Sequence, residues 1–98
     1  MIVVLDLAKV PQGIGMSVQA TEKIRIAIFR DGDRVTAIDD RCPHAGASLA
    51  QGGFNGTIVK CPLHGFCVDV WTGLGNGGKR VRIFPVRVSQ NQVEVTVE

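Results

Sequence analysis

Two short cysteine–histidine motifs constrain this 98-residue chain more than any other feature of its sequence. The first motif, C-P-H, covers residues 42–44, and the second, C-P-L-H, covers residues 61–64. Together they use both histidines of the protein and two of its three cysteines. A lone Cys or His is usually a packing residue, but two pairs in two separate loops predict that the loops bind metal together.

The composition is that of one small domain. At 98 residues a single core is only moderately stabilising, so a metal centre that ties two loops together would add stability. Asp6 interrupts the N-terminal apolar run and no basic residue precedes it, so we expect no signal peptide, no membrane segment and a cytoplasmic location. The net charge of +2 gives no reason to expect a nucleic-acid partner, and an odd number of cysteines argues against a disulfide framework.

Strand-like segments fill most of the remaining chain. Polar and apolar residues alternate through residues 23–30, and an Asp-Gly turn then leads into a second alternating segment at 34–38, which predicts a hairpin. Further strand-like stretches cover residues 2–5, 16–20, 57–60, 80–88 and 92–97. No segment keeps a 3.6-residue period, and residues 45–51 could form at most one helical turn.

Many short strands separated by turns predict an all-β antiparallel sandwich or barrel. Both motifs lie in the middle of the chain, with strands on either side. We therefore expect a single domain of residues 1–98, with a β base of residues 1–40 and 67–98. A small subdomain of about residues 41–66 would carry the metal site.

Residues 73–78 read G-L-G-N-G-G and formally match the dinucleotide-binding pattern G-x-G-x-x-G. That pattern needs a helix after it, but a strand-like stretch follows here, and the chain has no room for a nucleotide-binding βαβ unit. We interpret this segment as a loose turn.

The order of the four candidate ligands bears on which metal they hold. Two cysteines and two histidines satisfy tetrahedral zinc, but zinc motifs usually place cysteines in one knuckle and histidines in the other. Here each loop supplies one of each, which suits two metals side by side, with the cysteines on one and the histidines on the other. A thiol protease would leave the second pair unexplained.

The pattern resembles a Rieske centre, a 2Fe–2S cluster in which two histidines replace two cysteines on one iron. The likeness extends to the flanking residues 41–49, 52–53, 61–66 and 84–88, and it covers roughly residues 20–98 of soluble Rieske-type ferredoxins. It implies a Rieske-like fold with one 2Fe–2S cluster. Two residues would bind the inner iron, Cys42 and Cys61, and two the outer iron, His44 and His64.

The same resemblance implies an electron carrier rather than an enzyme. Such a protein takes single electrons from a flavin-containing, NAD(P)H-dependent reductase and passes them to the terminal oxygenase of an aromatic-ring dioxygenase system. We expect it to act as a monomer in aromatic hydrocarbon catabolism. Two alternatives stay open, the small subunit of a nitrite-reductase-like complex and a structural zinc-binding module.

The residues near the ligands imply a potential at the low end of the Rieske range, which spans about −150 to +300 mV. High-potential members have an extra disulfide between the loops and two hydroxyl groups bonded to cluster sulfur. The corresponding disulfide positions are Ala47 and Leu63, the serine position is Phe66, and the chain contains no tyrosine.

The other residues around the motifs have simpler interpretations. Cys67 and Trp71 are expected to be structural, and the charges of residues 39–41 to be solvated turn charges, with partner docking as the alternative. Members of the family often cover the cluster with a proline-bearing third loop. Residues 73–80 contain no proline, which leaves the shielding of this side undetermined.

Overall fold

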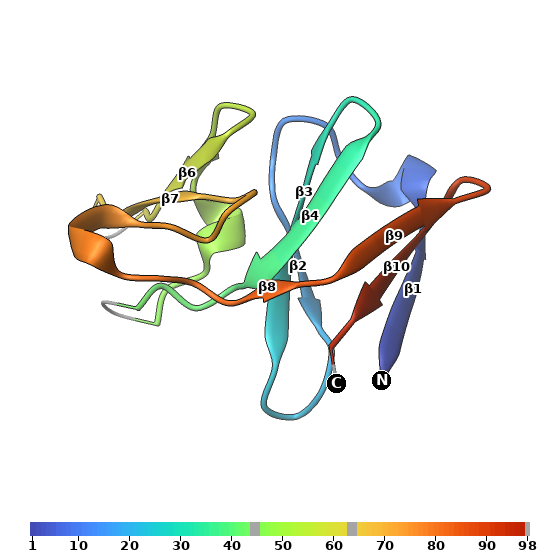
Figure 1. Ribbon diagram of the computed structural model, residues 1–98, viewed down its shortest axis with the longest axis horizontal. Helices are drawn as coiled ribbons and strands as arrows, with labels where there is room; N and C mark the ends of the chain where they lie inside the picture. Colours follow the sequence, from blue (N-terminus) through green and yellow to red (C-terminus); the bar gives the residue numbers. More distant parts are fainter. Residues whose placement is uncertain (44–45, 63–64, 98) are drawn as a thin grey trace.

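The computed structural model describes residues 1–43, 46–62 and 65–97 (Figure 1). These residues are all-β, as predicted, and form three antiparallel sheets. The first sheet has the order β1–β10–β9, with β1 at Ile2–Asp6, β10 at Gln92–Thr96 and β9 at Val86–Ser89. The second has the order β2–β3–β4–β8, at Met16–Gln19, Arg25–Asp31, Arg34–Asp39 and Ile83–Phe84. The small third sheet has the order β5–β6–β7, at Gly53–Phe54, Ile58–Lys60 and Cys67–Asp69.

The helical structure of the described residues consists of short 3₁₀ turns. They are η1 at Leu7–Lys9, η2 at Leu49–Gln51 and η3 at Asn76–Gly78. The single turn expected within residues 45–51 corresponds to η2. Within the described part of the chain, no helix has the length and apolar character needed to span a membrane.

Strand β3 separates two cores. Its four consecutive apolar residues, 26–29, are all fully buried, and alternation along the strand sends them in turn to opposite faces. One face packs into the base core, between the first two sheets: Val10, Ile26, Ile28, Ala37, Phe84, Val93, Val95 and Val97. The other face packs into the site core, beneath the third sheet: Ala27, Phe29, Ile38, Cys42, Leu49, Ala50, Val59, Cys61, Phe66, Val68, Val70 and Val81.

The predicted hairpin is confirmed. Asp31 pairs with Arg34 across a two-residue turn, and Gly32 in that turn has the positive φ of +63° that the tight turn needs. The continuous strand expected over residues 80–88 is wrong in two respects. It begins at Ile83, and Pro85 divides it into β8 and β9.

Proline divides the segment because it has no backbone N–H to donate to a sheet ladder. Before Pro85, β8 pairs with β4 of the second sheet, and after it β9 pairs with β10 of the first sheet. The chain therefore passes from one base sheet to the other between β8 and β9, which Figure 1 shows as one continuous run.

The third sheet is inserted between β4 and β8. Strand β7 begins at Cys67 and pairs with β6, so the sheet continues beyond the subdomain end expected at about residue 66. The subdomain boundaries stay a proposal. On this pairing we place the end of the inserted part shortly before β8.

Candidate metal centre

The two cysteine–histidine motifs lie in loops of equal length. The first loop covers residues 42–47, and the second covers residues 61–66. Each is closed at its base by an antiparallel pair of residues, which is Arg41 with Ser48 in the first loop and Lys60 with Cys67 in the second. The spacings C-x-H and C-x-x-H therefore occur in two versions of one six-residue loop.

The same backbone hydrogen bond closes each loop. The Cys42 N–H donates to the Ala47 carbonyl oxygen at 2.8 Å, and the Cys61 N–H donates to the Phe66 carbonyl oxygen at 2.7 Å. In both loops the first residue is thus tied to the sixth. The two cysteines consequently take equivalent places, each at the start of its loop.

A glycine occupies the fifth position of each loop. Gly46 has a φ of +69° and Gly65 a φ of +67°, in the left-handed region that favours glycine over other residues. Proline occupies the second position in both loops, at Pro43 and Pro62. The shared positions of Cys, Pro and Gly are the sequence signal of this repeated loop. His44 and His64 lie outside the described residues.

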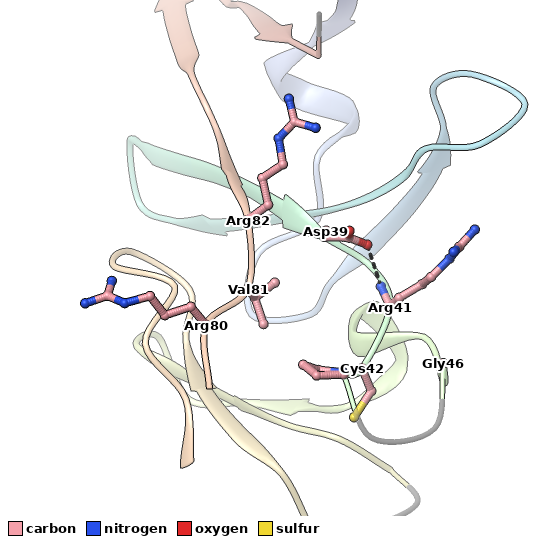
Figure 2. Close-up of a pocket in the computed structure, with 8 residues that line it drawn as sticks. Asp39, Arg41, Cys42, Gly46, Arg80, Val81 and Arg82 are labelled. Carbon is pink, nitrogen blue, oxygen red and sulfur yellow. Dashed lines mark hydrogen bonds between the residues drawn. The ribbon is translucent and has the colours of Figure 1, made fainter. Parts of the chain in front are cut away.

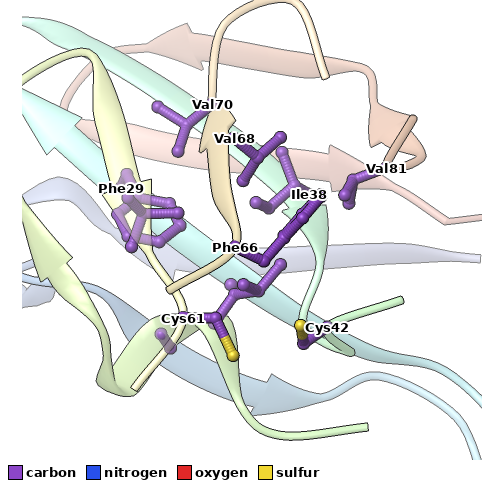
Figure 3. Close-up of a cluster of buried hydrophobic side chains, with 12 residues drawn as sticks. Phe29, Ile38, Cys42, Cys61, Phe66, Val68, Val70 and Val81 are labelled. Atoms are coloured by element: carbon purple, nitrogen blue, oxygen red, sulfur yellow. The ribbon is translucent and has the colours of Figure 1, made fainter. Parts of the chain in front are cut away.

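The structure brings the two loop cysteines to the same buried place. Cys42 and Cys61 are each 2% exposed and belong to the site core, and Figure 3 shows both sulfur atoms at the end of that core beyond Phe66. Two buried cysteine sulfurs against an apolar wall are suited to ligate one iron of an iron–sulfur cluster. This part of the predicted ligand set therefore fits such a cluster.

The third cysteine is placed differently. Cys67 is half-buried, and its Sγ donates to the Gly65 carbonyl oxygen at 3.4 Å. It begins β7, in which the next residue, Val68, is fully buried, so alternation turns Cys67 toward the other face of the strand. Its placement supports the structural role predicted for it.

Asp40 departs from the sequence-based interpretation. It is fully buried, and its carboxylate accepts hydrogen bonds from four groups. Arg25 Nε donates to Oδ2 at 2.6 Å, in an ion pair, and Ser17 Oγ donates to the same oxygen at 2.9 Å. Ser48 Oγ donates to Oδ2 at 2.8 Å, and the Ala50 N–H donates to Oδ1 at 2.8 Å. The expectation of a solvated turn charge is therefore wrong for this residue.

The bonds of Asp40 fasten the first loop to the base. Its partners come from β2, β3 and the segment that follows the loop, and its own position is two residues before Cys42. The neighbouring Arg41 is exposed, as expected. No motif marks Asp40 in the sequence, because its side-chain partners lie 8 to 23 residues away along the chain.

The glycine-rich segment 73–78 is held against β7 rather than loose. The Asp69 N–H donates to the Leu74 carbonyl oxygen at 3.0 Å, and the Cys67 N–H donates to Asn76 Oδ1 at 2.6 Å. Gly75 packs closely against the Phe66 ring, since a Cβ added there would clash with Phe66 Cζ. The segment therefore covers one side of the site core.

We expect Gly75→Ala to destabilise the protein by about 1–3 kcal/mol, the usual cost of overpacking a core. The φ of Gly75, −117°, is open to alanine, so the cost comes from crowding, chiefly against the Phe66 ring and secondarily against the Cys67 carbonyl oxygen. Gly53→Ala is the matched control, because nothing lies within 4 Å of a Cβ added there. Urea unfolding of both variants tests the difference, and equal stabilities would contradict the proposed contact.

A solvent-open hollow of about 420 Å³ lies beside Cys42. Residues 80–82, which follow the glycine-rich segment, form one side of it, and the first loop forms the other (Figure 2). Asp39 also lines this hollow, and its Oδ1 accepts a hydrogen bond from the Arg41 N–H, at the start of the first loop, at 2.9 Å. In this protein, residues 80–82 therefore lie beside the first loop, on the side where many family members have a proline-bearing third loop.

Trp71 packs at the edge of the third sheet. It is partly buried, and its indole N–H donates to the Gly56 carbonyl oxygen at 2.9 Å. The Arg34 guanidinium carbon lies 3.9 Å from its ring centroid, in cation–π contact. These contacts support the packing role expected for Trp71.

Comparison with known proteins places this loop pair in a family. The Rieske [2Fe-2S] domain family matches residues 1–85. The anthranilate 1,2-dioxygenase ferredoxin subunit of Burkholderia cepacia is 40% identical over 75 residues, which cover 74% of this chain and 69% of that protein.

Solved structures share the fold over nearly the whole chain. One is a chain in the complex of reduced oxygenase and oxidised ferredoxin in carbazole 1,9a-dioxygenase, with a TM-score of 0.85, 29% identity, and coverage of 93% of this chain and 96% of that one. A putative NADH-dependent nitrite reductase small subunit from Mycobacterium tuberculosis has a TM-score of 0.87 and covers 100% of this chain and 96% of that one. At 21% identity, this second likeness shows the fold alone. With its two equivalent loops and the match over residues 1–85, the chain belongs to the Rieske [2Fe-2S] domain family.

Proposed function

We propose that this chain is an electron-carrier ferredoxin whose 2Fe–2S cluster is held by two residues of each loop. The proposed ligands are Cys42, His44, Cys61 and His64. The observation that carries the proposal is the pair of equally closed loops that brings two buried cysteines to one end of the site core. When bound, a cluster of this family supplies a centre that accepts and releases one electron at a time.

The chain itself contributes position, charge and exclusion of water. Cys42 and Cys61 would supply two thiolates, which together with two sulfides offset the charge of two ferric ions. The two imidazoles would be neutral and would leave the oxidised cluster at zero charge. Phe66, 3% exposed, closes the core behind the second loop and presents a ring where a high-potential relative has a hydroxyl. We therefore propose a potential in the lower part of the Rieske range.

The relatives support a place in a dioxygenase system. One is named as the ferredoxin subunit of anthranilate 1,2-dioxygenase, and another is described in complex with an oxygenase. We propose that this chain likewise passes electrons to the terminal oxygenase of an aromatic-ring dioxygenase, after receiving them from a flavin-dependent reductase. Monomeric and cytoplasmic action stay predictions.

The nitrite-reductase alternative is less well supported, because the small subunits of that kind are 21% and 25% identical to this chain, against 40% for the anthranilate 1,2-dioxygenase ferredoxin subunit. The zinc alternative conflicts with membership of the Rieske family. The zinc module and the electron carrier make different predictions for purified protein, so one set of measurements separates them.

We expect purified protein to be coloured, to contain about two irons per chain, and to give an EPR signal only after reduction with dithionite. A redox titration should give a midpoint below about +100 mV, because hydroxyl groups that stabilise the reduced cluster are absent. A colourless protein with one zinc per chain would overturn the electron-carrier proposal. A higher midpoint would overturn only the low-potential assignment.

A further inference from the structure

Charge is unevenly distributed along this chain. Residues 41–82 contain five Lys and Arg residues and a single acidic residue, which gives this part a net charge of +4. The rest of the chain contains six Lys and Arg residues and eight acidic residues, a net charge of −2. The modest total of +2 therefore conceals a strongly basic part, and that part carries both loops of the metal centre.

The five cations of residues 41–82 are all exposed, and they lie around the loops. Figure 2 shows the guanidinium groups of Arg41, Arg80 and Arg82 directed outward on three sides of the hollow beside Cys42. Lys60 directly precedes Cys61, and its Cε lies 3.5 Å from where a Cβ of Gly65 would stand. The fifth cation, Lys79, directly precedes Arg80. Together these residues form what we call the basic rim: Arg41, Lys60, Lys79, Arg80 and Arg82.

Within the described part of the chain, no residue of the basic rim forms an ion pair, and Asp39 is the one acidic residue that lines the same hollow. Across residues 1–43, 46–62 and 65–97, the ion pair of Arg25 with Asp40 is the only one, and it lies in the base. The acidic residue of this part, Asp69, instead accepts hydrogen bonds from the N–H groups of Trp71 and Thr72.

Within the described part of the chain, the guanidinium groups of Arg41 and Arg82 donate hydrogen bonds to backbone carbonyl oxygens and form no ion pair with a carboxylate. Arg41 donates to Lys23 O at 3.3 Å, and Arg82 donates to Val97 O at 3.2 Å. These bonds orient the two side chains without cancelling their charge. The rim therefore projects positive potential into solvent next to the metal loops.

We propose that the basic rim docks a partner protein whose electron-transfer face is rich in carboxylates. The proposal rests on the electron-carrier function above, because an electron carrier must bring its metal loops close to a second protein. Complementary charge at that contact would raise the association rate and orient the two proteins. The attraction should weaken as salt is added, since exposed charges are screened.

The test compares Lys79→Glu/Arg80→Glu with Lys9→Glu/Arg87→Glu. Both double variants change the net charge by the same amount. The control residues are exposed and lie in η1 and β9, at the opposite end of the molecule from the third sheet (Figure 1). Dithionite-reduced protein is mixed in a stopped-flow instrument with the cobalt(III)–EDTA anion, which takes one electron and becomes cobalt(II).

We expect the wild type to react faster at low salt than at high salt. At low salt the Lys79→Glu/Arg80→Glu protein should react at least about fivefold more slowly than the control variant, because local attraction is replaced by repulsion. With the hexaamminecobalt(III) cation as oxidant, the same variant should instead react faster than the control. Calorimetric titration with poly-L-glutamate should show the matching loss of affinity for a carboxylate-rich surface.

The outcomes separate this proposal from the proposed function. Equal rates and equal poly-L-glutamate affinities for the two double variants, with normal iron–sulfur spectra in both, would overturn the docking surface alone. Wild-type protein without a reducible iron–sulfur spectrum would overturn the electron-carrier function, and the docking proposal with it. Opposite responses to the two oxidants, confined to the rim variant, would support the basic rim.

Discussion

Cys42→Ser and Cys61→Ser are each expected to give protein that lacks the 2Fe–2S absorption and the EPR signal of reduced wild type, whereas Cys67→Ser should retain both. Iron content should fall from about two per chain toward zero in the first two variants and stay unchanged in the third. The chain thus supplies its own control, a third cysteine a few residues after the second loop cysteine.

The expected difference follows from where the three sulfur atoms lie. Cys42 and Cys61 are the first residues of equivalent loops and are buried at the same end of the site core. Cys67 lies within β7 and donates from Sγ to a backbone carbonyl oxygen. Replacing that thiol with a hydroxyl preserves a hydrogen-bond donor, so the surroundings of Cys67→Ser need not change.

A full iron complement in Cys61→Ser together with its loss in Cys67→Ser would show that the ligand assignment is wrong. Serine oxygen sometimes replaces a cysteine ligand, so Cys42→Ala and Cys61→Ala complete the series. If the alanine variants also kept two irons and the reduced EPR signal, these residues could not be the ligands.

Asp40→Ala is expected to lower the free energy of unfolding by about 2–4 kcal/mol, because a buried carboxylate that accepts four hydrogen bonds is lost, while Arg25, 33% exposed, regains some of its hydration. The variant leaves Arg25 without its counter-ion, and the buried Ala50 N–H loses its hydrogen bond to Asp40 Oδ1. Both groups then bear part of their desolvation cost without compensation. Urea unfolding followed by circular dichroism measures the loss.

Asp39→Ala is the matched control for this prediction. Asp39 is the preceding residue and is only half-buried, and its carboxylate accepts one hydrogen bond, from the Arg41 N–H. Its removal should cost about 0.5–1.5 kcal/mol, the value of one ordinary hydrogen bond. If the two alanine variants were equally stable, the buried network around Asp40 would not contribute as proposed.

Asp40 also shows where reasoning from sequence stops. The four proposed ligands, the β class and the hairpin of β3 and β4 all follow from local patterns, since each depends on residues close together in the chain. A buried carboxylate depends instead on four partners from other segments, and nothing next to Asp40 distinguishes it from Asp39. Sequence alone favours the solvated interpretation because charged residues are seldom fully buried.

The error in the strand predicted over residues 80–88 has a different cause. Alternation of polar and apolar residues continues through residues 80–88, so the pattern gives no sign of a change of sheet. Pro85 is the one local signal, because it removes a ladder donor, and it marks the division that the structure shows. The covering of Phe66 by Gly75 could not be predicted either, since it depends on a close approach between two segments.

Because both faces of β3 are buried, each in a different core, we expect the two cores to unfold together. Ala27 and Phe29 belong to the core beneath the metal loops, while Ile26 and Ile28 on the same strand belong to the core between the base sheets. Unfolding of the two base sheets would therefore also remove Ala27 and Phe29 from the core on which the metal loops pack. We expect unfolding and loss of the cluster to occur as one cooperative event, so that the inserted part has no independent existence as a folding unit.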